Sequence, residues 1–137
     1  VDALVAKASP DSEKEAIDLL RQAWEESGQY RHKLRIGDIQ MRQMSRQIKA
    51  LRAELQKNPE DEDVKQRLRD AASRQLTFEL KEFQERVKNY PTDMGLRYEL
   101  GRRLYQTGQI DEAIGAFQQA KADPKQRAGA HMYLGQC

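Results

Sequence analysis

The fold is decided by the stretch Met94–Cys137, which reads MGLRYELGRRLYQTGQIDEAIGAFQQAKADPKQRAGAHMYLGQC. Its dipeptide Leu100-Gly101 returns as Leu134-Gly135, and 134 − 100 = 34 residues separate the two. A fixed period of roughly that length is the sequence signature of a helical unit that stacks on copies of itself. We therefore expect stacked helical repeats in this part of the chain.

Two breaks divide this stretch into helices. Gly108 follows one segment of helically spaced apolar residues, and Asp123-Pro124 follows the next. Glycine commonly ends a helix, and proline cannot continue one. The pattern predicts helices at residues 94–107 and 111–122, the second ended by Pro124, and a last helix that starts near Gln126.

Small residues stand where two helices must approach closely, and large apolar residues fill the space between them. The full pattern consists of Arg97-x-x-Leu100-Gly101-x-x-Leu104, Gly108, Ala113-Ile114-x-x-Phe117, Ala120 and Pro124. It resembles the tetratricopeptide repeat family, clearly over residues 94–137 and weakly over residues 11–30. The resemblance implies an all-α array of helix–turn–helix repeats, the architecture of an α-solenoid.

The resemblance also implies where a partner would bind. In this family the equivalent face of each repeat's first helix lines a concave groove that holds peptide ligands, and here Gly95 and Gly129 also lie on it. The candidate partner-binding residues are Tyr98, Glu99, Arg102, Gln106, Met132, Tyr133 and Gln136. Tyrosine and arginine anchor partners because they combine contact area with hydrogen-bond donors. An ordinary solvated helix face, which carries the same residue types, is the alternative.

A heptad pattern precedes the repeat, in residues 29–90. Apolar residues recur every seven positions, at Leu34, Met41, Ile48 and Leu55. This is the spacing of a coiled-coil seam. Asn58-Pro59 interrupts it, and we expect Asn58 to cap the next helix, with Pro59 as its first residue.

Two long helices joined by so short a turn fold back antiparallel. Facing positions in such a hairpin have a constant sum of residue numbers, and the apolar positions nearly keep that sum throughout. The predicted facing pairs include Leu55–Val64, Leu51–Leu68, Ile48–Ala71, Met44–Leu76 and Gly37–Phe83. We therefore expect a long, coiled-coil-like helical hairpin ahead of the repeat.

The chain thus divides into three expected parts. Residues 1–28 hold an N-terminal helix, capped by Ser9, that resembles a degenerate repeat. Residues 29–90 form the antiparallel hairpin, with its turn near 58–60, and residues 91–137 form one repeat and the first helix of another. Because the chain starts without methionine and stops within a repeat, we expect a fragment of a longer protein.

Charge restricts the classes of partner. The chain carries 24 Lys+Arg against 22 Asp+Glu, and a net charge of +2 is too small to imply a polyanionic partner. Residues 1–28 carry three basic and seven acidic groups, however, while residues 29–58 carry eight basic and two acidic. Arg35, Arg42 and Lys49 form a basic stripe along one hairpin arm. Ion pairs across the hairpin and ordinary solvation explain this stripe more simply than phosphate contacts.

No group of residues points to catalysis, a metal or a cofactor. His32 and His131 lack neighbours at ligand spacing, and we expect His131 to pack in or beside the repeat core and His32 to be exposed. The single cysteine, Cys137, leaves the compartment open, with the cytoplasm favoured. No apolar run is long enough to span a membrane.

The sequence predicts a non-catalytic scaffold or adaptor that binds protein or peptide partners through the repeat helices or the hairpin. One alternative is a homo-oligomerisation module, in which exposed seam residues such as Met44 and Leu51 pair between chains. Binding to nucleic acid or an acidic surface is less supported, because the basic stripe lacks aromatic residues for base stacking.

Overall fold

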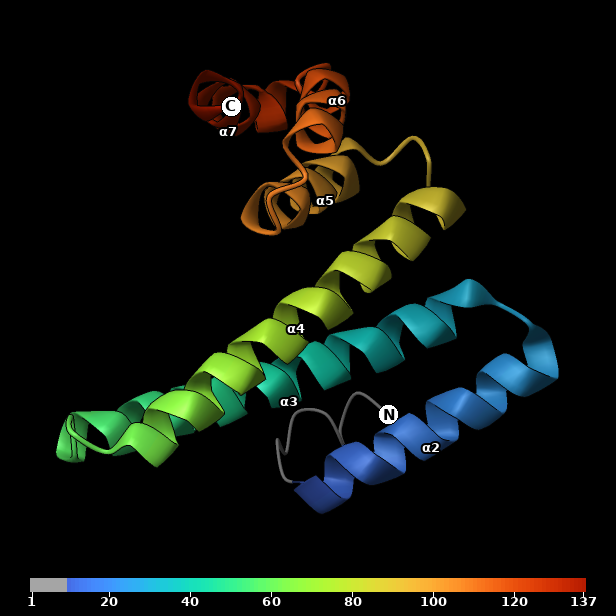
Figure 1. Ribbon diagram of the computed structural model, residues 1–137. Helices are drawn as coiled ribbons and strands as arrows, with labels where there is room; N and C mark the ends of the chain where they lie inside the picture. Colours follow the sequence, from blue (N-terminus) through green and yellow to red (C-terminus); the bar gives the residue numbers. More distant parts are fainter. Residues whose placement is uncertain (1–9) are drawn as a thin grey trace. The chain divides into compact units, whose positions relative to one another are not determined.

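The computed structural model describes residues 10–137, which contain six helices and no strand (Figure 1). The helices are α2 Pro10–Ser27, α3 Tyr30–Lys57, α4 Glu62–Asn89, α5 Met94–Gln106, α6 Ile110–Ala120 and α7 Pro124–Gln136. The predicted all-α fold class is confirmed. The chain forms two compact units that divide between Ala72 and Ser73, within α4.

In the first unit, α2 packs along α3 and returns antiparallel to it (Figure 1). Their core consists of Ala16, Leu20, Ile36 and Ile39, all buried. Gly28 has a φ of 69°, which only glycine adopts without strain, and it ends α2 as the sequence predicts. The predicted cap at Ser9 lies outside the described residues.

One charged pair lies within this α2–α3 contact. The side chain of Glu13 is 0% exposed and forms an ion pair with Arg46 of α3, whose side chain is 40% exposed. A buried carboxylate is costly unless it is paired. Arg46 therefore helps to hold α2 on α3.

The turn between α3 and α4 differs in detail from the prediction. Asn58 does not cap α4, and Pro59 is a turn residue, because α4 begins only at Glu62. The cap is Asp61, whose Oδ1 accepts hydrogen bonds from the backbone amides of Asp63 and Val64 at 3.0 and 3.2 Å. The carboxylate of Asp61 satisfies amides that would otherwise be unpaired at the helix start.

Next to this turn, apolar residues of α3 and α4 form a small cluster. It contains Ile48, Leu51 and Ala71, all buried, with Leu68 packed against them. These residues belong to two of the predicted facing pairs of the hairpin. The pair Leu55–Val64 also belongs to the first unit, but the pairs Met44–Leu76 and Gly37–Phe83 involve residues of the second unit and stay predictions.

The second unit contains the end of α4 and the helices α5, α6 and α7. The Asp93 side chain caps α5 by accepting a hydrogen bond from Leu96 N, and Gly108, with a φ of 80°, forms the turn into α6. The core is made of Leu104, Ala113, Ala116, Phe117 and Ala130, all buried.

The beginning of α7 corrects the sequence prediction. Pro124 is the first residue of α7. We had expected Pro124 to end the preceding helix and α7 to start near Gln126. Asp123 caps the helix by accepting a hydrogen bond from Lys125 N at 3.0 Å. Proline is compatible with the first helical position because no partner exists there for its missing N–H.

Candidate partner-binding site

The packing of α5 depends on two glycines that each receive an aromatic ring. A Cβ added at Gly101 of α5 would lie 2.8 Å from Cε1 of Phe117 in α6. A Cβ added at Gly129 of α7 would lie 2.6 Å from the hydroxyl oxygen of Tyr98 in α5. Both distances are far below van der Waals contact. The two glycines thus let α6 and α7 each approach α5 closely.

An aromatic cluster fills the space between these helices. Phe117 and Tyr133 stack with ring centroids 4.8 Å apart and planes 5° from parallel. Tyr98 meets both rings edge-on, at 5.8 Å from Phe117 and 6.0 Å from Tyr133. Tyr105 completes the group at 5.5 Å from Tyr133. Stacked and edge-on pairs are the favourable geometries for aromatic rings, so the cluster fixes the register of α5 against α7.

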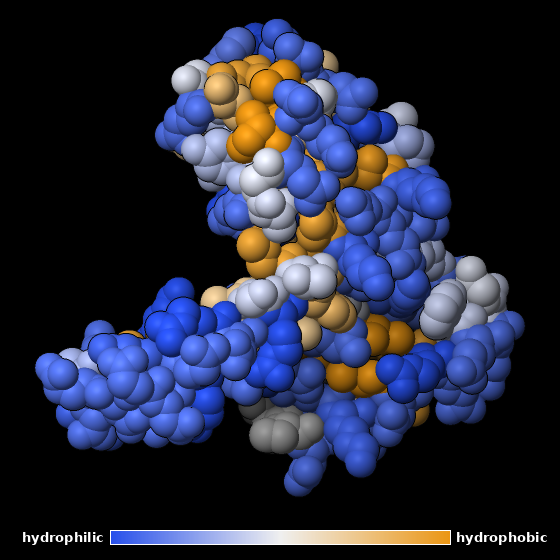
Figure 2. All heavy atoms as spheres, in the orientation of Figure 1, coloured by the Kyte–Doolittle hydropathy of each residue, from blue (hydrophilic) through white to orange (hydrophobic). Residues whose placement is uncertain are grey.

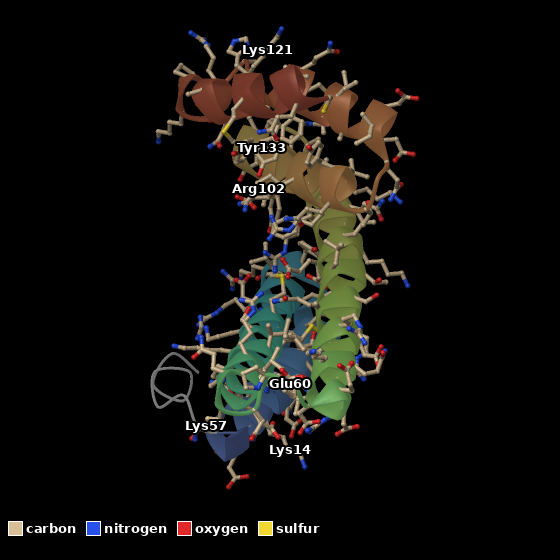
Figure 3. All side chains as sticks on the ribbon, turned by 60° about the vertical axis from the view of Figure 1, so that its left-hand side comes forward. Lys14, Lys57, Glu60, Arg102, Lys121 and Tyr133 are labelled. Carbon is tan, nitrogen blue, oxygen red and sulfur yellow. The ribbon has the colours of Figure 1, made fainter. Side chains whose placement is uncertain are left out.

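Arg102 joins α5 to α7 beside this cluster (Figure 3). Its guanidinium donates hydrogen bonds to the side chains of Tyr133 and Glu99, the Glu99 Oε2 at 3.1 Å. Burial alone would lower the pKa of Arg102, but the hydrogen bond to Tyr133 and the negative charge of Glu99 raise it overall. The side chain remains 38% exposed. Arg102 is therefore a fixed cation that is still open to solvent.

The neighbouring Arg103 forms a second network, which links α5 to the end of α4. Its guanidinium donates to Glu79 Oε1 at 2.6 Å, pairs with Glu99 and lies 4.5 Å above the ring centroid of Phe83. Arg86 lies 5.2 Å from the same ring. The sequence patterns did not predict this network. Its one sequence signal was the spacing of four between Glu99 and Arg103, which suits ion pairing along a helix.

Two overlapping stretches of the chain, residues 61–127 and 98–137, match the tetratricopeptide repeat family model. Together they span residues 61–137, which is more than half of the chain. The chain belongs to the tetratricopeptide repeat family. Repeats of this family generally mediate protein–protein interaction, and the family is typically non-catalytic. No curated protein and no solved structure matches the chain.

The match extends the repeat region beyond the resemblance seen in the residues. It begins at Asp61, at the start of α4, whereas the sequence pattern is clear only from Met94. The helices do not keep the 34-residue spacing of the sequence, because α7 begins at Pro124, 124 − 94 = 30 residues after the start of α5 at Met94. Gly101 is buried against Phe117, whereas Gly135 is exposed.

The seven candidate residues divide into two groups in the repeat. Tyr98 and Tyr133 are half-buried and contribute to packing, so the face they share is not simply a solvated one. Burial raises the pKa of the Tyr98 phenol above its usual value, with a smaller contribution from Tyr133. The other five keep solvent contact, namely Glu99, Arg102, Gln106, Met132 and Gln136.

Met132 is the most distinctive exposed member of this set. It is a large hydrophobic residue that remains 54% exposed on α7, one position before the packed Tyr133. On the visible face in Figure 2, hydrophobic residues gather over α6 and α7. Methionine adapts its shape to irregular surfaces and is common at binding surfaces.

Two other expectations about the repeat are corrected. His131 is exposed and does not pack in the core, because Ala130 is the α7 residue that turns inward. Arg97, the first residue of the repeat pattern, is half-buried rather than part of the core, and it donates hydrogen bonds to Pro91 O and, at 2.6 Å, to Gln119 Oε1. His32 is half-buried, although we expected it to be exposed.

Within residues 10–137, no three His, Cys, Asp or Glu side chains are grouped as metal ligands would be. No helix in the described part of the chain has the length and hydrophobicity needed to cross a bilayer. Cys137 is exposed.

Proposed function

We propose that this chain is a non-catalytic interaction module whose α5–α7 face binds a protein or peptide segment. The proposed contact residues are Tyr98, Glu99, Arg102, Gln106, Met132, Tyr133 and Gln136. The observation that carries the proposal is the fixed register of two helices that together present an exposed methionine and an exposed, oriented arginine. A pre-organised surface of this kind binds at a smaller entropic cost.

The side chains of the α5–α7 face suit a partner segment that carries both apolar and polar groups. Met132 offers an apolar contact, and Gln106 and Gln136 offer both donors and acceptors. The charge of Arg102 is already partly neutralised by Glu99. A partner would therefore accept an oriented hydrogen bond from Arg102, and a new salt bridge would contribute less. A partner with an apolar side chain next to a polar group fits best.

Two alternatives receive less support from the described residues. The seam residue Leu51 is buried against Ala71 of its own chain, so it is not available for pairing between chains. Arg46, another cation of α3, forms an ion pair with Glu13 within the chain, and the basic stripe itself lacks aromatic residues for base stacking.

The test is a selection of short random peptides on the whole protein, followed by fluorescence anisotropy with each enriched peptide. Arg102→Ala and Met132→Ala should each weaken binding by about tenfold, as expected for contact residues near the centre of an interface. Gln118→Ala, on the exposed side of α6, is the matched control and should leave the affinity unchanged. Failure to enrich any peptide, or equal binding by all three variants, would refute the proposal.

A further inference from the structure

The first unit carries two charged stripes of opposite sign with the same spacing. On α2, Asp11, Asp18 and Glu25 follow each other at seven-residue intervals and are all exposed. On α3, Arg42 and Lys49 are exposed at the same interval, and Arg35 precedes them by seven residues. Each stripe spans 14 residues, which is about 21 Å of helix.

Most of these charges have no partner among the residues that the structure describes. Within residues 10–137, no ion pair or side-chain hydrogen bond involves the three acidic residues of the α2 stripe, nor Arg42 or Lys49 of the α3 stripe. Arg35 does have an interaction within the chain, so the inference relies on Arg42 and Lys49.

The packing of α2 on α3 explains why the stripes do not neutralise each other. Ala16 and Leu20 are the α2 residues that pack on α3. Asp11, Asp18 and Glu25 lie on the other side of α2 by the helical period of 3.6 residues, and they point away from α3. Within one chain, the acidic stripe of α2 therefore does not lie on the basic stripe of α3.

We infer that the first unit binds a second copy of this chain, with the acidic stripe of α2 on the basic stripe of α3. Oppositely charged residues at matched seven-residue intervals select helical partners and set their alignment. The two stripes have the same seven-residue spacing and opposite sign, which favours a helix of this same chain over a nucleic acid. The basic stripe also offers no aromatic side chain for base stacking.

One apolar residue adds to this surface. Leu19, 44% exposed, adjoins Asp18 at the edge of the acidic stripe. Exposed ion pairs contribute little each and are screened by salt. The contact should therefore be weak at physiological salt and strengthen at low ionic strength. This inference concerns a surface separate from the α5–α7 face, so either can fail without the other.

The experiment uses two charge-reversed proteins. In Asp18→Lys/Glu25→Lys the α2 stripe becomes basic, and in Arg42→Glu/Lys49→Glu the α3 stripe becomes acidic. All four positions are exposed helical positions, so helix content by circular dichroism should be retained. Lys14→Glu/Arg21→Glu, also exposed on α2, is the control for a general change of charge.

Sedimentation equilibrium at low ionic strength should show concentration-dependent dimers of the wild type, lost at high salt. For each reversed protein alone the dissociation constant should rise by at least about tenfold, because like charges then face each other. An equimolar mixture of the two should associate again, since each supplies the stripe that the other needs. The control should still form dimers.

Three results would overturn the inference. One is a wild-type protein that stays monomeric at every accessible concentration. The second is a mixture of the two reversed proteins that associates no better than either alone. The third is an RNA oligonucleotide that binds the wild type and not Arg42→Glu/Lys49→Glu, in the absence of any dimer, which would assign the basic stripe to a polyanion.

Discussion

The contact between Gly101 and Phe117 makes the sharpest prediction about the repeat. In Gly101→Ala the new Cβ would lie 2.8, 2.9 and 3.0 Å from three atoms of the Phe117 ring. Ordinary carbon contacts are about 3.5–4.0 Å. Phe117 is completely buried and stacks on Tyr133, so its ring cannot move aside without disturbing α7.

Two opposing effects determine the magnitude. Overpacking a close-packed core costs about 1–3 kcal/mol, whereas replacing a helical glycine by alanine gains about 1 kcal/mol. We therefore expect Gly101→Ala to destabilise the second unit by up to about 2 kcal/mol. Gly115→Ala in α6, where no atom lies within 4 Å of the new Cβ, should instead stabilise it by about 1 kcal/mol.

The assay is urea unfolding with probes that report on each unit separately. Trp24 is the single tryptophan and lies in the first unit, whereas most of the tyrosines lie in the second. The free energy of unfolding, measured by the near-ultraviolet signal of the tyrosines, should be about 1–3 kcal/mol lower for Gly101→Ala than for Gly115→Ala. The unfolding transition measured by tryptophan fluorescence should be the same for both variants. Equal stabilisation by both substitutions would show that Gly101 does not receive the Phe117 ring, and would refute the packing described.

Three further predictions follow from the charged and polar groups. Arg46→Ala should destabilise the first unit by about 2 kcal/mol in tryptophan-detected urea unfolding, because it leaves the Glu13 carboxylate buried and unpaired. Arg42→Ala, which breaks no ion pair, should stay within about 0.5 kcal/mol of wild type. Burial raises the pKa of Tyr98 above 10.0, so its contribution to stability is complete below that pH and is lost as the pH rises through the folded-state value. Tyr98→Phe should thus reduce the alkaline loss of stability measured by urea unfolding across that range. Arg103→Lys keeps the charge but cannot pair with two carboxylates in a planar fork, and it should lower the midpoint of tyrosine-detected unfolding.

The helices and their repeat were predictable because they depend on local spacing. Gly101, Ala113 and Ala120 are small residues that are buried where helices pack closely. Gly28 and Gly108 end helices through positive φ angles, which few other residues adopt. These features appear in a single chain without any tertiary information.

The helix starts were less predictable, because several nearby residues can serve the same purpose. Asn58 and Asp61 are both good caps, and only the folded turn shows that Asp61 lies within reach of the free amides. Pro124 is compatible with either end of a helix, and the Asp123 cap decides that it is a start.

The candidate site was predicted only in part. The spacing placed Tyr98, Arg102 and Tyr133 on one side of their helices, but it could not show how closely α5 and α7 pack. That closeness depends on Gly129, whose missing side chain makes room for the Tyr98 hydroxyl. The network around Arg103 depends on where the end of α4 meets α5, which no spacing rule determines.

The claim that α5 and α7 present one partner-binding face is tested most directly by amide nuclear magnetic resonance of the protein with an enriched peptide. We expect the largest chemical-shift changes at Glu99, Arg102, Met132 and Gln136, with the exposed side of α6 around Gln118 unaffected. Changes confined to α6 or to the first unit would contradict the claim.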